Sequence, residues 1–168
     1  MAEKNEQIVE IDGVWDEQKI HFTGKCEVTY QNGDVYKGEV EQNVREGFGT
    51  YYYSNQDIYE GEWVGGRKNG KGKMTYSNGT FYEGSWKKGL KSGKGKVCFV
   101  NGDEYEGTFK EGAISGEGIY TFTDGKIYKG TFKEGMLNGK GELIFQNQDK
   151  YFGNFVDSQA HGQGVYHF

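Results

Sequence analysis

One segment of this chain is similar to a nucleotide-binding motif. Residues 65–72, Gly-Gly-Arg-Lys-Asn-Gly-Lys-Gly, match the spacing of a phosphate-binding loop, Gly-x4-Gly-Lys. That loop needs a Ser or Thr after its lysine to ligate Mg²⁺, and then a helix. Here Gly72 takes the Ser/Thr position and a strand-like alternation follows. We therefore predict that the segment does not bind nucleotide.

The other residues able to do chemistry also lack a site pattern. His21, His161 and His167 show no metal-ligand spacing and have no cysteine or acidic cluster beside them. Acidic residues recur at regular intervals along the chain, whereas a catalytic pair is expected once, where a pattern is interrupted. Asn78-Gly79-Thr80 matches a glycosylation sequon, but we interpret it as a turn. We predict no catalytic residue, no metal site, no cofactor and no enzymatic activity.

Composition excludes further classes of protein. Hydrophobic residues make up only 34% of the 168 residues, yet 16% are aromatic, with 29 glycines and no proline. Low hydrophobicity is typical of disorder, but disordered chains are poor in aromatics, so we predict a folded chain. A net charge of −5 argues against general nucleic-acid binding. The lack of an apolar run, a signal peptide or a set of paired cysteines predicts a cytoplasmic protein without a transmembrane segment.

A period of 23 residues organises almost the whole chain. Counting from a tyrosine at position 0, Gly follows at +2, Trp or Phe at +4, Gly at +7, +11 and +13, and Asn-Gly or Asp-Gly at +19 and +20. A fixed period of this length is the signature of a repeat architecture. Six repeats start at Tyr36, Tyr59, Tyr82, Tyr105, Tyr128 and Tyr151. The departures are Val40 at +4, Asn43 and Ser158 at +7, and Gln56 and Gln148 at +20.

Tyr-x-Gly-x-Trp/Phe followed by Gly-x-Gly resembles the MORN (membrane occupation and recognition nexus) repeat, over roughly residues 24–168. The resemblance implies a non-catalytic role in ciliary or other cytoskeletal structures, in membrane contacts, or as an appendage of lipid kinases or methyltransferases. The last role would need a separate chain, because these repeats come without a catalytic domain.

Period-two alternation between turn signals predicts two short strands per repeat, at 0 to +4 and +13 to +17. We expect an all-β fold, a single-layer twisted antiparallel β-meander of about thirteen or fourteen strands. Residues 1–10 are predicted to be a flexible tail, and 11–168 the repeat array with an atypical cap over 11–35. Ile11–Trp15 would be a capping strand, and Cys26 a small residue in the tight site of the second Gly of Gly-x-Gly.

Strand register follows from the loop at Ser77-Asn78-Gly79. A three-residue loop with Gly79 left-handed pairs Gly72 with Gly84, and it places every ring on one face. Each +4 ring should then cover the +11 glycine opposite it, for example Trp63 over Gly47. The other face should pair opposite charges, namely Lys73 with Glu83, Lys96 with Glu106 and Glu27 with Lys37.

The ring-lined face is the first candidate binding surface, since a single sheet has no second layer to cover it. We predict that a partner helix or peptide lies in a groove there, on Tyr59, Trp63, Tyr82, Trp86, Tyr105, Phe109, Tyr128 and Phe132, with Tyr53, Tyr76, Phe99 and Phe122 on the same face. The alternative is that these rings only stack on one another and on glycine.

A basic edge is the second candidate. Between Arg67 and Lys96 there are nine basic residues and one acidic residue, Glu83, and several lie at +5 to +12, where we expect turns. Such an edge would bind an acidic protein tail or an anionic lipid headgroup; the alternative is a solvated edge that maintains solubility. The candidate residues are Arg67, Lys68, Lys87, Lys88, Lys91 and Lys94.

The last predicted strand, 164–168, is the third candidate, because it carries no Lys, Asp, Glu or Pro to protect a sheet edge. We expect Val165, Tyr166, His167 and Phe168 to pair with a second copy or another component; a frayed strand is the alternative. The sequence as a whole predicts a scaffold that binds protein partners in a cytoskeletal, ciliary or axonemal assembly. The alternative function is a phosphoinositide-binding membrane adaptor.

Overall fold

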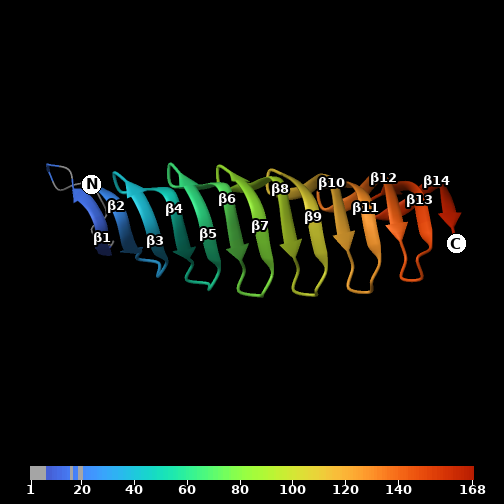
Figure 1. The fold of residues 1–168 in the computed structure, drawn as a ribbon, viewed down its shortest axis with the longest axis horizontal. Helices are drawn as coiled ribbons and strands as arrows, with labels where there is room; N and C mark the ends of the chain where they lie inside the picture. Colours follow the sequence, from blue (N-terminus) through green and yellow to red (C-terminus); the bar gives the residue numbers. More distant parts are fainter. Residues whose placement is uncertain (1–6, 16, 19–20) are drawn as a thin grey trace. The chain divides into compact units, whose positions relative to one another are not determined.

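The computed structural model describes residues 7–15, 17–18 and 21–168, and it confirms the predicted all-β meander (Figure 1). Fourteen antiparallel strands form one sheet in which the strands follow chain order. They are β1 Gln7–Trp15, β2 Phe22–Thr29, β3 Val35–Glu41, β4 Val44–Tyr52, β5 Ile58–Val64, β6 Arg67–Thr75, β7 Phe81–Lys87, β8 Leu90–Cys98, β9 Glu104–Lys110, β10 Ala113–Thr121, β11 Ile127–Lys133, β12 Met136–Ile144, β13 Lys150–Val156 and β14 Gln159–His167. None of the described residues belongs to a helix that could cross a membrane.

The chain divides into two compact units. The first unit holds the chain up to Gly79 together with Trp86–Leu90, and the second holds Thr80–Ser85 and Lys91–Phe168. The same repeat geometry occurs within both, so each unit is described by itself below.

A tight turn joins the two strands of each repeat. At Lys88-Gly89 and at Glu111-Gly112 both residues have positive φ, 51° and 88° in the first turn and 50° and 90° in the second. Two such residues form a type I′ hairpin loop, whose twist matches that of the strands. The second strand therefore begins at +8. The predicted long turn over +5 to +12 is wrong, because a bulge at the left-handed +11 glycine, such as Gly116, absorbs the extra residue within the strand.

The longer loop between repeats has the predicted three-residue form. The Phe99 amide donates to the Asp103 carbonyl at 2.9 Å, and the Gly102 amide donates back to the Phe99 carbonyl at 2.9 Å. Gly102 is left-handed with φ 89°, and Gln56 adopts the same conformation without being glycine, with φ 73°. The expected pairing of glycines across strands is confirmed, for instance Gly49 with Gly61 and Gly95 with Gly107.

The ring that covers these glycines is the tyrosine at position 0, and this corrects the predicted contact. Trp63 does pair with Gly47, but a side chain at Gly47 would meet the Glu39 carboxylate. A Cβ at Gly49 would instead collide with the Tyr36 ring. The Tyr36 hydroxyl donates to the Glu39 carbonyl at 2.7 Å, which holds the ring flat over the backbone. Tyr59, Tyr105 and Tyr128 make the same bond three residues ahead.

Rings also contact rings in a regular series. The Tyr59 ring lies 5.1 Å from Trp63 and 5.2 Å from Trp86, at interplanar angles of 87° and 85°. In the second unit Tyr105 contacts Phe109 and Phe132 in the same way, at 5.4 and 5.0 Å. Edge-to-face contacts of this kind add about 0.5–1.5 kcal/mol to the burial of each ring. A single layer of strands thereby acquires a core.

The outer face carries charge pairs, as predicted, but not all with the predicted partners. The Lys37 ammonium lies 2.9 Å from the Glu27 carboxylate, which confirms that pair. Lys96 stands opposite Glu106 in the register, yet its ion pair is with Glu104 at 2.9 Å. The reason is that Glu104 also accepts the Cys98 thiol, so its carboxylate lies between the two side chains.

At the amino-terminal side, β1 pairs with β2 from Gln7 onward, with a register shift between Glu10 and Asp12. Residues 7–10 thus belong to a strand and not to the predicted tail; residues 1–6 lie outside the described part. Cys26 is buried opposite Gly38, as expected for a small residue in a tight site, and burial raises the pKa of its thiol.

The packing over paired glycines predicts very different tolerance at two glycines of β5 and its turn. A Cβ at Gly61 would lie 2.5 Å from the Gly72 Cα, where backbone must move, whereas at Gly65 it would meet nothing within 4 Å. Gly61→Ala should lower the free energy of unfolding by about 1–3 kcal/mol. Gly65→Asn should change it by less than about 0.5 kcal/mol, because Asn tolerates the left-handed conformation. Urea denaturation measures both; equal losses would contradict the tyrosine-over-glycine packing.

Candidate functional site

The rings predicted to bind a partner directly are buried by their own chain. Tyr59, Tyr82, Tyr105 and Tyr128 are 0% exposed, and Trp63, Trp86, Phe109 and Phe132 are at most 5% exposed. The edge-to-face series and the glycine backbone cover each ring on both sides. This burial agrees with the alternative interpretation, in which the rings at 0 and +4 stack on one another and on glycine, and partner binding through these rings stays a prediction.

Two other rows of side chains form the accessible surface on this side of the sheet. We call the ring face the side that holds residues at 0, +4, +9, +15 and +17. The +17 row is aromatic, and it is half-buried at Tyr30, Tyr53, Tyr76, Phe99, Phe122 and Phe145 and exposed at Phe168 in the last repeat. The +9 row is also half-buried at Arg45, Lys68, Lys91, Ile114 and Leu137, whereas Ala160 in the last repeat is exposed. The sequence pattern did not predict the +9 row, because position +9 was expected to lie in a turn.

In the first unit the +9 row places cations over rings. The Arg45 guanidinium carbon lies 4.6 Å from the Trp63 ring centroid and 5.0 Å from that of Tyr51. Its Nη2 donates to the Gly66 carbonyl at 2.8 Å. The Lys68 ammonium lies 4.6 Å from the Trp86 ring and 5.3 Å from the Tyr59 ring. The ring quadrupole stabilises a cation at such distances.

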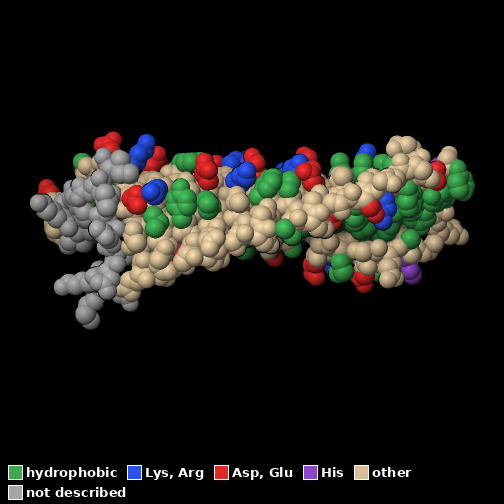
Figure 2. Space-filling view, turned by 90° about the horizontal axis from the view of Figure 1, so that it is seen from below, with side chains coloured by type: hydrophobic (Ala, Val, Ile, Leu, Met, Phe, Trp, Pro, Cys, Tyr) green, Lys and Arg blue, Asp and Glu red, His purple; other side chains and the backbone are tan. Residues whose placement is uncertain are grey.

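In the second unit the +9 row changes from charged to apolar. The Lys91 ammonium lies 5.0 Å from the Tyr82 ring, and the next two members are Ile114 and Leu137. Figure 2 shows hydrophobic side chains gathered over the carboxy-terminal strands. The same position therefore offers positive charge in one part of the array and apolar surface in another.

The predicted basic edge does not exist as a single feature. Lys68 and Lys91 belong to the +9 row on the ring face, because β6 and β8 begin earlier than expected. The other four candidates are exposed: Arg67, Lys87, Lys88 and Lys94. Only Lys88 lies in a tight turn, with Lys87 at the end of β7.

A ladder of side-chain acceptors ties the longer loops together, and it was not predicted from the sequence. The residue at +21 accepts from the backbone amide at +18 of the next repeat. Ser54 thus donates to Asp34 at 2.8 Å and Thr123 to Asp103 at 2.8 Å. In the same way, Asp57 accepts from the Ser77 amide at 2.8 Å. The Thr80 hydroxyl accepts from the Val100 amide at 3.2 Å. The ladder fixes where successive loops lie.

Two of these aspartates are buried, and each also accepts from a tyrosine hydroxyl. Tyr51 donates to Asp34 at 2.7 Å and Tyr120 to Asp103 at 2.8 Å. Burial alone would raise the pKa of Asp103. Hydrogen bonds from Thr123, Tyr120 and Asn101 outweigh it and hold that pKa below its usual value. Burial and the Asp103 hydrogen bond together raise the pKa of Tyr120 to about 12. The partners of these carboxylates come from neighbouring loops and from strands β4 and β10, so the perturbed groups hold loops and strands together.

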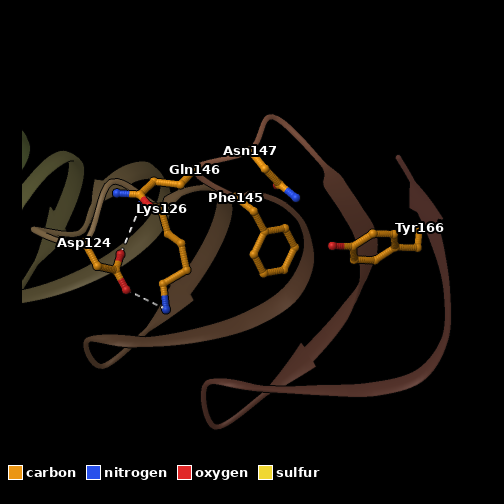
Figure 3. Close-up of a pocket in the computed structure, with 6 residues that line it drawn as sticks. All are labelled: Asp124, Lys126, Phe145, Gln146, Asn147 and Tyr166. Atoms are coloured by element: carbon orange, nitrogen blue, oxygen red, sulfur yellow. Dashed lines mark hydrogen bonds and ion pairs between the residues drawn. The ribbon is translucent and has the colours of Figure 1, made fainter.

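The ladder is interrupted at Lys126, and an open pocket of about 440 Å³ lies there (Figure 3). Lysine cannot accept a hydrogen bond, so the Gln146 amide lacks the acceptor that the four preceding loops provide. Lys126 pairs instead with Asp124 at 2.8 Å. Phe145, Asn147 and Tyr166 complete the lining, with the Phe145 ring between Lys126 and Tyr166 in Figure 3.

Two further expectations concern metal and the last strand. The described residues contain no group of His, Cys, Asp and Glu able to hold a metal ion. The predicted edge residues Val165, Tyr166 and His167 lie in β14, which pairs with β13 and is exposed along its length; Phe168 follows it. Pairing of this edge with another strand stays a prediction.

The geometry defines a class of protein: a repeat-built, single-layer antiparallel sheet with one aromatic face. The MORN repeat pattern matches six consecutive segments, 36–58, 59–81, 82–104, 105–127, 128–150 and 151–168. The chain therefore belongs to the MORN repeat family. No curated relative matches it.

Solved structures share the fold at low sequence identity. The TCP10 domain of Danio rerio CPAP, in complex with a peptide of Danio rerio STIL, is 17% identical with a TM-score of 0.50, over 77% of this chain and 59% of that one. The G-box domain of the microcephaly protein CPAP is 14% identical with a TM-score of 0.50, over 98% and 99%. The Drosophila melanogaster SAS-4 TCP domain, in complex with a proline-rich motif of Ana2, is 19% identical with a TM-score of 0.46, over 86% and 84%. The likeness is one of fold, and this chain spans little more than half of the Danio rerio CPAP chain.

Restoring the ladder at Lys126 should stabilise the protein. The double change Asp124→Asn, Lys126→Asp recreates the Asn-Gly-Asp loop of residues 101–103, where Asn101 donates to Asp103 at 2.9 Å. The new carboxylate should accept from the Gln146 amide and raise the free energy of unfolding by about 1 kcal/mol, measured by urea denaturation.

Asp57 provides the matched control for this variant. The Asp57 carboxylate accepts from the Ser77 amide without a tyrosine hydroxyl, because the +15 residue of the next repeat is Met74. Position 126 has the same setting, since the corresponding +15 residue is Leu143. Asp57→Ala should lower the free energy of unfolding by a similar amount. A restored loop that is no more stable than the wild-type loop would show that the ladder does not hold the repeats together.

Proposed function

We propose that this chain is a non-enzymatic scaffold that binds a helix or an extended peptide of a partner protein along its ring face. The observation that carries the proposal is the half-buried aromatic +17 row, next to a +9 row that is itself half-buried. Aromatic side chains that are fixed in place yet partly accessible dominate many protein interfaces. A sheet without a second layer leaves such a row available.

The structural neighbours support binding of this kind. The TCP10 domain of Danio rerio CPAP, which is similar to this chain in fold, was solved in complex with a peptide of Danio rerio STIL. For this chain we propose the same mode of binding, namely a peptide bound by the sheet, but not the same partner. The contacts would come from the +9 and +17 rows and not from the buried rings at 0 and +4.

We place the partner in a cytoskeletal assembly, and in particular a ciliary or axonemal one. The MORN resemblance implies such a role, and the CPAP G-box structure is described as suggesting a role in centriole elongation. A cytoplasmic, cytoskeletal location follows from this proposal.

Site-specific photo-crosslinking at neighbouring tyrosines tests the scaffold proposal. Tyr51 and Tyr53 contact each other at 4.5 Å, so both point to the ring face, whereas Tyr52 points to the other face and is 39% exposed. A photoreactive amino acid at position 53 should give a discrete adduct in a lysate of the source cell, and the same group at position 52 should give none. Equal adducts at both positions would contradict docking on the ring face.

An anionic-lipid adaptor is the second candidate, and the exposed cations Arg67, Lys87, Lys88 and Lys94 favour it. Electrostatic attraction contributes about 1 kcal/mol per cation near an anionic membrane and weakens with salt. If this function is correct, vesicles containing a phosphoinositide should sediment the protein at low salt and much less at high salt. Lys87→Gln with Lys88→Gln should weaken that binding. Equal recovery with neutral vesicles would argue against it.

A further inference from the structure

The longer loops repeat one hydrogen-bonding position, and one copy of it is open. In four repeats the +21 side chain accepts from the backbone amide at +18 of the next repeat, at 2.8–3.2 Å; these acceptors are Asp34, Asp57, Thr80 and Asp103. In the following repeat the +21 residue is Lys126 and the amide is that of Gln146. An ammonium has only donors, so it cannot replace the missing oxygen. Among the hydrogen bonds of the described loops, none starts from the Gln146 amide.

The filled copies show which ligand this position takes. The Asp103 Oδ1 accepts from the Thr123 amide at 2.8 Å and from the Thr123 hydroxyl at 3.1 Å. The Asp34 Oδ1 accepts from the Ser54 amide at 2.8 Å. Burial raises the pKa of both carboxyls, and the hydrogen bonds outweigh it, so that both pKa values lie below the usual value. The position therefore holds an ionised carboxylate.

The open copy of this position lies at the pocket of about 440 Å³ (Figure 3). Pockets of about 300–1,000 Å³ commonly hold small ligands. The Asn147 side-chain amide and the Tyr166 hydroxyl both donate to Asp149, at 2.7 and 3.3 Å, so these polar groups are engaged. The rings of Phe145 and Tyr166, with centroids 5.7 Å apart, offer an apolar wall beside the Gln146 amide.

Lys126 brings a second donor to the pocket. Its ammonium lies 2.8 Å from the Asp124 carboxylate and 5.5 Å from the centroid of the Phe122 ring. An ammonium has three N–H donors, so an ion pair with one carboxylate leaves donors for another oxygen. Because Asp124 balances the charge of Lys126, an anion would be held here by directed hydrogen bonds and not by net charge.

We propose that this pocket binds a carboxylate of a second molecule, which accepts hydrogen bonds from the Gln146 amide and the Lys126 ammonium. An apolar group next to that carboxylate lies against the rings of Phe145 and Tyr166. The bound carboxylate takes the place that the Asp103 carboxylate takes one repeat earlier. An aspartate within a partner peptide and the terminal carboxylate of a peptide offer the same chemistry, and the test distinguishes them.

The inference is independent of the proposed scaffold function. Phe145 also belongs to the +17 row, but a small ligand can fill the pocket without a partner that docks along the row. The two are therefore tested by different measurements.

Nuclear magnetic resonance of the ¹⁵N-labelled full chain tests the site with short peptides. Acetyl-Leu-Asp-amide carries a side-chain carboxylate, acetyl-Gly-Leu carries a terminal carboxylate, and acetyl-Leu-Asn-amide is the neutral control. A carboxylate peptide should move the Gln146 amide proton downfield in a saturable way and leave that of Thr123, already bonded to Asp103, in place. It should bind about five-fold more tightly than the Asn peptide, because hydrogen bonds to an ionised group are stronger.

Two variants and a control locate the binding. Asp124→Asn with Lys126→Asp supplies a carboxylate from the chain itself and should abolish peptide binding. Since this variant is expected to be more stable than the wild type, the loss cannot come from unfolding, and a urea denaturation curve checks it. Lys126→Met should remove the five-fold preference for the carboxylate and keep the shift at Gln146. Asp57→Ala opens the same loop position at another repeat, away from the pocket, and should leave binding at Gln146 unchanged.

The outcomes separate this inference from the scaffold function. Tighter binding of one carboxylate peptide than of the other supports the site and identifies the source of the carboxylate. Equal affinity for the Asp and Asn peptides, or binding that persists in the Asp124→Asn, Lys126→Asp variant, would overturn the inference. A Gln146 amide that does not respond to either carboxylate peptide at millimolar concentration would also overturn it. None of these results affects the scaffold function, which the crosslinks at positions 52 and 53 test.

Discussion

The contact of a tyrosine ring with two glycines opposite each other is the constraint on which this fold depends. Gly38 pairs with Gly49, and the Tyr36 ring fills the space where their side chains would be. The tyrosine hydroxyl then donates a hydrogen bond to the backbone carbonyl three residues further along, which fixes the orientation of the ring. Glycine weakens a strand because it packs nothing, and here the ring supplies the missing contact. The period of 23 residues follows, because each tyrosine, its two paired glycines and the connecting loops must recur at the same spacing in every repeat.

Much of this architecture could be predicted from the sequence because it rests on local and cross-strand rules. The alternation of apolar and polar residues, the Asn-Gly loops and the requirement that all rings lie on one face predict the register, including the pairing of Gly95 with Gly107. The sequence left open whether Tyr59 and Trp63 are buried, since their burial arises from contacts between rings of successive repeats. Turn residues that are not glycine, such as Lys88 and Glu111, gave no sign of left-handed conformation.

That one error about turns explains most of what was missed at the candidate site. Because +5 to +12 was expected to be a loop, Lys68 and Lys91 were assigned to a basic edge, whereas both lie in strands over rings. The loop aspartates were also missed. Their role appears only when Asp103 is seen beside Tyr120 and the Thr123 amide of the next repeat. The candidate binding surface therefore consists of the half-buried +17 rings and the +9 side chains beside them, and not of the buried rings at 0 and +4.

The ladder of loop carboxylates also determines how cooperatively the array folds. In a solenoid each repeat contacts only its neighbours, so stability is a sum of repeat terms and interface terms. The tie from Asp103 to Thr123 strengthens one such interface, and the lysine at position 126 leaves the following interface without it. Interfaces of unequal strength give an array preferred places to break. Partially folded forms that keep the chain through residue 126 ordered and lose the repeat beyond it would therefore be more populated than if the tie were present, and a partner that spans that interface would stabilise the repeats on both sides of it.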